Sequence, residues 1–463
     1  MRNRVHRSAF RAPWRPFSST SFGSEKQAML EVWAWGKGDA GQLGAGDDRN
    51  HQTPHLIARM ERPPNLHLAH MQGLSRRTPL SQLFPSLDCV PFPGHSHEKP
   101  VSLQDHSLSG QHAHNDPEHP PASFGVACGL FHSAMLVDGE LWTWGKGEAG
   151  RLGLGSELPK YKPTSNPHLE DVRNVALGGL HCAATAEDGS LYTWGFGAFG
   201  ALGHGRYKAE LSPRQLLLTQ DKADSVAYVA GGGAHSAAIT SFGDLYTWGR
   251  DEGDGRLGHG DDLVTDEGAV NAPLQVVLMP EPVVSVSCGG FFTMALTSGG
   301  KAWSWGGNAN FELGRGDTLS RNKPSIIPEV EGMHVAQIAC GGFHSAILTV
   351  DGLVLTWGRG GDGQLGHGSW QNGITPKVVE ALAHLRIGYI ACGSFSTAAI
   401  TESGELYCWG KNKYHQLGFR GKLDSENIPK QVFFSREDDQ FNEKPPVVAV
   451  ALGASHGIGL ILN

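Results

Sequence analysis

A Trp-Gly pair followed eight or nine residues later by a Leu-Gly pair occurs seven times in the chain, and this repetition constrains the fold more than any other feature. The pairs begin at Trp35, Trp144, Trp194, Trp248, Trp305, Trp357 and Trp409. From Trp144 onward they are 50 to 57 residues apart, whereas the first gap is 109 residues. A period of this length is typical of solenoids, propellers and repeat arrays.

A glycine turn precedes the Trp-Gly pairs, as in the segment Cys340-Gly341-Gly342-Phe343-His344-Ser345. Alternating residues flank this turn in Val335–Ala339 and Ser345–Thr349, and Asp351-Gly352 is expected to close a two-residue hairpin before Leu353–Trp357. No window of the repeat region has a sustained apolar period of 3.6 residues, which excludes a helical repeat. Each unit therefore predicts a β-meander, and four-stranded blades arranged radially leave few exposed sheet edges.

The two ends of the repeat region are complementary halves of one unit. The chain ends with the first half, Val447–Leu462, which has no Trp-Gly hairpin after it, and residues 29–60 begin with the missing half, Met29–Gly36. We therefore predict an all-β, seven-bladed β-propeller of four-stranded antiparallel blades. The N-terminal strands would complete the last blade and close the ring.

The pattern Leu-Tyr-x-Trp-Gly-x-x-x-x-Gly-x-Leu-Gly-x-Gly, best seen in residues 191–205, resembles the regulator of chromosome condensation repeat. The resemblance covers roughly residues 29–60 and 124–463 and implies a seven-bladed propeller. It does not imply one activity, because the family includes a nucleotide exchange factor for a small GTPase, a plant UV-B photoreceptor and several organelle proteins. The photoreceptor's Gly-Trp-Arg-His-Thr turns are absent here, where Leu130-Phe131-His132-Ser133 is a typical counterpart.

The segment 1–28 does not belong to the repeats. Its first 22 residues contain five arginines, several serines and no acidic residue. Such composition is typical of an organelle transit peptide, and the dense arginine favours the mitochondrial matrix, with cleavage after Phe17. An ordinary basic tail is the alternative. The sequence has no apolar run long enough to span a bilayer.

An insertion at 61–123 accounts for the long first gap. It contains 10 of the 26 prolines and 8 of the 23 histidines, with no Trp, no Gly-Gly turn and no strand alternation. This composition predicts a disordered loop between two blades, because it offers too little apolar surface to offset the entropy of ordering. A retained intron or a gene-model error is the alternative.

No catalytic constellation stands out in the sequence. Four Gly-x-Gly-x-x-Gly matches lack the strand-to-helix context of a dinucleotide site and predict blade turns with positive φ. The repeated histidines, His132, His181, His235, His344 and His456, occupy equivalent positions in different blades and are expected to be structural rather than to converge on a metal. Cysteines recur at one repeat position, which favours buried reduced thiols. We expect no enzyme activity, cofactor or metal.

The fourth unit contains a cluster of acidic residues that includes Asp251, Glu252, Asp254, Asp261 and Asp262. A solvated loop is the simpler interpretation, and a docking site for a basic partner is the alternative. The net charge of −8 makes direct nucleic-acid binding doubtful.

Together these features predict a non-enzymatic scaffold that binds a protein partner on one propeller face. The resemblance to plant mitochondrial members of the family implies support of organellar RNA processing, such as intron splicing, and of respiratory complex biogenesis. The alternative is a guanine-nucleotide exchange factor for a small GTPase. The projecting β-wedge of the family's exchange factor has no evident counterpart in this sequence.

Overall fold

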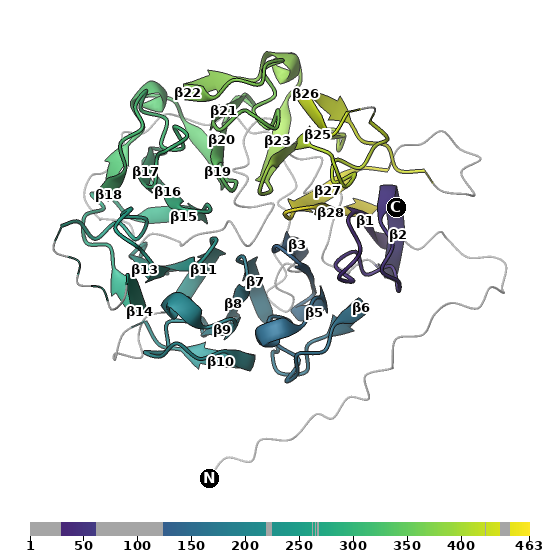
Figure 1. The fold of residues 1–463 in the computed structure, drawn as a ribbon, viewed down its shortest axis with the longest axis horizontal. Helices are drawn as coiled ribbons and strands as arrows, with labels where there is room; N and C mark the ends of the chain where they lie inside the picture. The colour runs from purple at the N-terminus through teal and green to yellow at the C-terminus, as the bar shows by residue number, and fades with distance from the viewer. Residues whose placement is uncertain are drawn as a thin grey trace, which may run out of the picture.

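The computed structural model describes residues 29–61, 124–218, 225–261, 263, 265, 268–421, 423–435 and 445–463. Within these residues, seven four-stranded antiparallel sheets are arranged as blades around a central axis (Figure 1). The regular structure besides strands consists of short 3₁₀ turns at Glu148–Gly150, Ala198–Gly200, Pro328–Val330 and Glu380–Leu382. The predicted seven-bladed propeller is confirmed.

The blades are numbered I to VII along the chain. Blade I contains β3 (Phe124–Cys128), β4 (His132–Val137), β5 (Glu140–Gly145) and β6 (Lys160–Ser165). Blade II contains β7 (Val172–Leu177), β8 (His181–Ala186), β9 (Leu191–Gly195) and β10 (Glu210–Leu216). Blade III contains β11 (Val226–Gly231), β12 (His235–Thr240), β13 (Leu245–Arg250) and β14 (Ala269–Gln275). Blade IV contains β15 (Val283–Cys288), β16 (Phe292–Thr297), β17 (Ala302–Gly306) and β18 (Arg321–Ile326). Blade V contains β19 (Val335–Cys340), β20 (His344–Thr349), β21 (Val354–Gly358) and β22 (Gly373–Val378). Blade VI contains β23 (Ile387–Cys392), β24 (Ser396–Thr401), β25 (Leu406–Lys411) and β26 (Ser425–Gln431). Blade VII contains β27 (Val447–Leu452), β28 (His456–Leu462), β1 (Met29–Gly36) and β2 (His51–Glu61).

Blade VII joins the two ends of the repeat region, with strand order β2-β1-β28-β27. Strand β1 pairs antiparallel with β28 from Leu30 opposite Leu462 to Gly36 opposite His456. The predicted closure by the N-terminal strands is therefore confirmed. Because every blade packs against two neighbours, the ring has no end blade with an uncovered face (Figure 1).

The hydrophobic core lies between the blades rather than at the axis. Seven buried clusters each combine apolar residues from two adjacent blades, and each contains one tryptophan of a Trp-Gly pair. All seven of these indoles are fully buried. The repeat therefore recurs because each blade-to-blade interface needs the same large side chain.

Glycine follows each buried tryptophan because the backbone there turns with positive φ beside the neighbouring strand. At Gly358, φ is +100°, and a Cβ atom would lie 2.8 Å from both the Phe343 carbonyl oxygen and the His344 Cα. Another residue at this position would be strained by conformation and by contact. In each Gly-x-Gly-x-x-Gly match the first and last glycines have the predicted positive φ, whereas the middle one does not, as at Gly147 with φ −95°.

One hairpin differs from the sequence prediction. Asp351-Gly352 was expected to form a two-residue connection, but the backbone N–H of Thr349 donates to the Leu353 carbonyl, which leaves Val350–Gly352 as a three-residue loop. Gly352 has φ +85° and its N–H donates to the Thr349 carbonyl. A turn followed by a left-handed glycine is the common three-residue hairpin solution.

The loops form two faces. We call the end of the ring that contains the glycine turns and the loops after each Trp-Gly pair the Gly-turn face, and the opposite end the hairpin face. The predicted targeting segment 1–28 and the insertion lie outside the described residues, except that Glu61 belongs to β2. Among the described residues, helices of sufficient length and apolarity to cross a bilayer are absent.

Candidate functional site

A belt of buried side-chain hydrogen bonds links consecutive blades beneath the Gly-turn face. The indole N–H of Trp409 in blade VI donates to the Gln364 carbonyl of blade V over 2.9 Å, and the Thr397 hydroxyl donates to the same oxygen over 2.8 Å. His344 of blade V contacts this hydroxyl through Nε2 at 2.8 Å. Equivalent histidine contacts join His132 to Cys182, His181 to Ser236, His235 to Thr293 and His456 to Ser133.

The histidines of the belt are locked in the core. All five are nearly fully buried. Burial lowers the pKa of His344 to about 3 and those of His181 and His456 to about 4, and it holds the pKa values of His132 and His235 well below the usual range. A buried imidazole that is already hydrogen-bonded to the next blade is suited to a structural role, as the sequence predicted.

The cysteines of the described residues are free thiols. Three of them, Cys288, Cys340 and Cys392, lie at the ends of the inner strands β15, β19 and β23. Burial raises the pKa of Cys340 to about 12 and raises the pKa values of the other two further. Of the four thiols at the shared repeat position, only Cys288 is buried, whereas Cys128, Cys340 and Cys392 are half-buried, so the predicted burial is confirmed in part. Their raised pKa values leave little nucleophilic thiolate.

Two separate cavities lie where the inner strands of several blades converge. On the Gly-turn side, a cavity of about 320 Å³ is lined by the glycine turns and by Leu130, Phe291, Phe343 and Phe395. On the hairpin side, a smaller cavity of about 170 Å³ is lined by residues that include Arg173, Asn174, Tyr228 and Gln337. The described residues contain no group of three or more His, Cys, Asp or Glu side chains that could hold a metal ion.

The acidic cluster predicted as a docking site divides into buried and exposed residues. Asp251 is only 5% exposed, burial raises the pKa of its carboxyl, and its Oδ1 accepts a hydrogen bond from the backbone N–H of Leu257 over 3.2 Å. Asp254 forms an ion pair with the buried guanidinium of Arg256. The carboxylates of Asp251 and Asp254 therefore stabilise the loop in which they lie.

The other acidic residues lie further out. Glu252 forms an ion pair with Arg250, and Asp261, whose side chain is 75% exposed, pairs with Lys323 of blade IV over 2.9 Å. Asp262 lies outside the described residues. Docking of a basic partner stays a prediction, and Glu252 and Asp261 are the described members of the cluster that a partner could reach directly.

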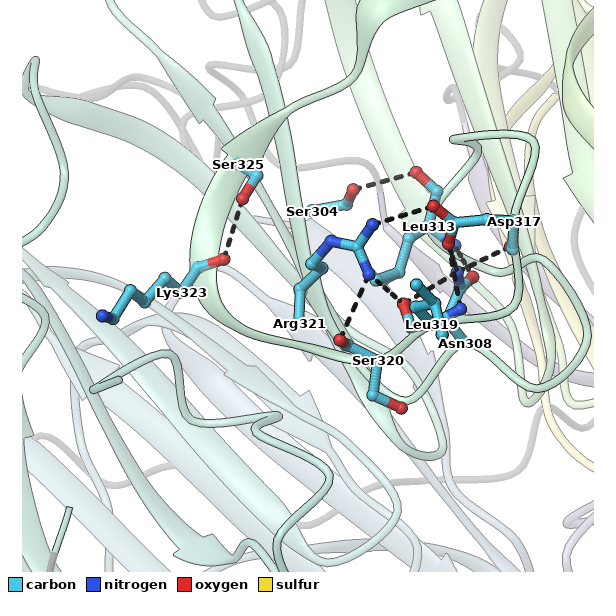
Figure 2. A network of polar contacts seen from close by, with 9 residues as sticks. All are labelled: Ser304, Asn308, Leu313, Asp317, Leu319, Ser320, Arg321, Lys323 and Ser325. Carbon is cyan, nitrogen blue, oxygen red and sulfur yellow. Dashed lines mark hydrogen bonds and ion pairs between the residues drawn. The ribbon is translucent and has the colours of Figure 1, made fainter. Parts of the chain in front are cut away.

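Asn308 of blade IV occupies the repeat position that Asp251 occupies in blade III. In the equivalent loop of blade IV, the amide of Asn308 donates to the carbonyl oxygen of Asp317 over 2.8 Å, and its Oδ1 accepts from the Leu313 N–H over 2.9 Å (Figure 2). Arg321 then pairs with Asp317 over 2.8 Å (Figure 2). Asp251 makes the corresponding bond to the backbone in blade III, so a short polar side chain at this position closes the loop.

Comparison with known proteins agrees with this architecture. Models described as "Regulator of chromosome condensation (RCC1) repeat" match residues 31–68, 351–400 and 403–460, and one described as "RCC1-like domain" matches residues 102–330. The Arabidopsis thaliana "RCC1 domain-containing protein RUG3, mitochondrial" is 42% identical over 93% of this chain and 88% of its own length. The chain belongs to the RCC1 repeat family. The resemblance inferred from the Trp-Gly and Leu-Gly pairs is thereby confirmed.

Other RCC1-family and structural relatives define how far the likeness extends. The Arabidopsis thaliana "Ultraviolet-B receptor UVR8" is 37% identical over 45% of this chain and 46% of its own length. Among solved structures, Prp20p of Saccharomyces cerevisiae superposes with a TM-score of 0.69 at 19% identity, covering 93% of this chain and 91% of that one. Human WBSCR16 gives 0.67 at 21% identity, covering 93% and 98%. These structural matches support the RCC1 propeller fold.

A set of surface residues on the Gly-turn face does not stand out from the repeat consensus. The residue after the Trp-Gly pair is basic in five blades, and the residue at the end of the glycine turn is phenylalanine in four. The basic residues are Lys37, Lys146, Arg250, Arg359 and Lys411, and the phenylalanines are Phe131, Phe291, Phe343 and Phe395. Aligning the repeats by position rather than by consensus would have revealed both rings.

Proposed function

We propose that this RCC1 propeller is a non-enzymatic scaffold that acts in mitochondria. The observation that carries the proposal is the 42% identity, over nearly the whole chain, to a plant relative whose name describes it as mitochondrial. The arginine-rich, acid-free start of the chain supports the same location. Support of organellar RNA processing, such as intron splicing, and of respiratory complex biogenesis is the role that the family resemblance implies.

The chemistry of the described residues favours binding over catalysis. The repeated histidines are hydrogen-bonded between blades, and burial lowers their pKa values, which makes them poor general bases at neutral pH. Loop side chains are exposed on two broad faces of a ring held by seven hydrophobic interfaces. A protein partner bound across several loops is the natural ligand for such a face.

Localisation and partner recovery test the proposal together. The full chain, carrying a C-terminal tag, is compared with a chain lacking residues 1–22 and with a control in which the five arginines before Phe17 are replaced by glutamine. We expect import of the full chain alone, and copurification of transcript-processing proteins. A nuclear or cytosolic chain bound to a small GTPase would instead favour nucleotide exchange, which release of labelled GDP from that GTPase would measure.

A further inference from the structure

An arc of aromatic and basic side chains borders the central cavity on the Gly-turn face. Phe291, Phe343 and Phe395, from blades IV, V and VI, follow one another with ring centroids 5.6 and 5.8 Å apart and planes inclined by 31° and 26°. The Arg359 guanidinium lies 5.4 Å from the centre of the Phe395 ring, and the Lys411 ammonium lies 4.7 Å from it. We call these five residues the aromatic–cationic arc.

The arc carries a local surplus of positive charge although the chain as a whole is acidic. Arg359 and Lys411 share a single carboxylate, Asp362, at 3.3 and 3.8 Å. The neighbouring Lys413 is exposed and forms no ion pair within the described part of the chain. Arg359 and Lys411 therefore carry one positive charge more than Asp362 neutralises, and Lys413 adds another on the same loop as Lys411.

The apolar part of the arc opens into the cavity of about 320 Å³, whose lining includes glycine backbone, thiols, the phenylalanine rings and the leucines Leu130, Leu177 and Leu452. This volume is near the lower end for pockets that bind ligands, roughly 300 Å³. Phe291 is 42% exposed at its edge. An apolar side chain from a partner could enter the cavity while the surrounding cations receive its acidic neighbours, an arrangement typical of anchor residues at interfaces.

Elsewhere on the Gly-turn face, the basic residues that follow the Trp-Gly pairs are neutralised by carboxylates. Lys37 pairs with Asp39 over 2.7 Å, Lys146 pairs with Glu148 over 2.9 Å, and Arg250 pairs with Glu252. A long polyanion such as RNA would therefore meet carboxylates beyond blades V and VI. A short acidic segment that reaches only the arc would meet the surplus charge alone.

We propose that the aromatic–cationic arc binds a short acidic segment of a protein partner, with an apolar residue of that segment seated in the central cavity. The inference rests on the proposed scaffold role and names the chemistry of the partner and the face that binds it. It concerns the isolated propeller, so it can be tested without regard to the compartment in which the chain acts.

The test selects a random 12-residue peptide library on the purified full chain and measures the affinity of the enriched peptides by fluorescence anisotropy. We expect peptides with an aromatic or aliphatic residue flanked by Asp or Glu. Their affinity should fall at least tenfold for R359E/K411E, for the neutral R359Q/K411Q and for F343A, and should weaken as the salt concentration rises. The control R173E/R386E makes the same change of charge on the hairpin face and should bind normally.

Several results would overturn the proposal. Enriched peptides that are basic, or that bind the arc variants as tightly as the original chain, would place recognition elsewhere. A twelve-nucleotide oligouridine that binds more tightly than the peptides, with the same dependence on Arg359 and Lys411, would make RNA the ligand of the arc. Thermal melting of each variant ensures that lost binding is not lost folding. A cytosolic location would refute the mitochondrial role and leave the peptide result standing.

Discussion

The indole N–H of Trp357 in blade V donates to the backbone carbonyl oxygen of Glu312 in blade IV over 2.7 Å. The Ser345 hydroxyl donates to the same oxygen over 2.8 Å. The same tryptophan bond crosses five other interfaces, from Trp35, Trp144, Trp194, Trp248 and Trp409. At the interface between blades III and IV this hydrogen bond is missing. The indole Nε1 of Trp305 is buried there and has no hydrogen-bond acceptor.

This difference between two equivalent tryptophans gives a matched pair of substitutions. Trp357→Phe removes a buried donor and its bond, whereas Trp305→Phe removes a donor that has no bond. Both lose similar apolar volume, so the difference should isolate the hydrogen bond. We expect the free energy of unfolding to fall by about 1 kcal/mol more for Trp357→Phe. Chemical denaturation of both variants measures it, and equal losses would show that the indole bond contributes nothing.

The sequence predicts the number of blades, their meander order and the closure of the ring, because each depends on a local pattern that recurs at a fixed period. The hydrogen bonds that join the blades are harder to predict from the sequence. The Trp35 indole donates to the carbonyl of Gln416, which is 381 residues away in the chain. In the sequence, Asp251 looks like any other acidic loop residue. Only the folded loop brings its carboxyl to the Leu257 N–H, from which it accepts a hydrogen bond. Such contacts follow from tertiary packing rather than from spacing.

Gly457 departs from the residue types found at the same repeat position in the other blades. The equivalent repeat position holds Ser, Cys or Thr in the other blades, but in blade VII a Cβ on Gly457 would lie 2.6 Å from Cε2 of the buried Trp35 ring. Gly457→Ala should therefore destabilise the closing blade by roughly 1–3 kcal/mol through overpacking. Gly459→Ala is the control, because its Cβ would lie at an ordinary 3.4 Å from the same ring. Thermal melting distinguishes them, and equal melting temperatures would contradict the close approach.

Glu312 is a buried carboxyl at a position where three of the other blades have glutamine, namely Gln42, Gln364 and Gln416. It is 3% exposed, burial raises its pKa, and its Oε2 accepts from the Asn310 N–H over 2.7 Å. Gln364 makes the same bond through Oε1 to the Asp362 N–H over 2.9 Å. Glu312→Gln should keep this bond, lose the one that Glu312 Oε1 accepts from the Asn310 side-chain amide over 2.8 Å, and remove the cost of a buried charge.

A raised pKa in the folded state means that the protonated form is favoured by folding. The original chain therefore loses stability as the pH rises from the usual glutamate value, 4.5, through the raised pKa of Glu312. The gain from Glu312→Gln should thus be larger at pH 8 than at pH 4.5. Melting temperatures across this range measure it. A gain that is the same at both values would mean that Glu312 ionises without cost.

The buried histidines predict the opposite pH dependence. Burial lowers the pKa of His344 to about 3, whereas the unfolded chain has the ordinary value of 6.5. Above pH 6.5 the histidine is neutral in both states and its contribution is fully present. As the pH falls below 6.5, the unfolded chain binds a proton that the folded chain does not, and stability decreases until about pH 3. Each such histidine adds a slope of up to about 1.4 kcal/mol per pH unit.

His344→Gln removes one of these titrations and leaves an amide that can still donate to the Thr397 hydroxyl. Between pH 6 and pH 4, its free energy of unfolding should fall less steeply than that of the original chain, by about 1.4 kcal/mol per pH unit. His384→Gln, at an exposed position on the hairpin side of blade VI, is the matched control and should leave the slope unchanged. Urea denaturation at several pH values gives the slopes. Parallel curves for all three proteins would mean that His344 takes up its proton in the folded ring, and the belt would then have to tolerate a charged imidazole between blades V and VI.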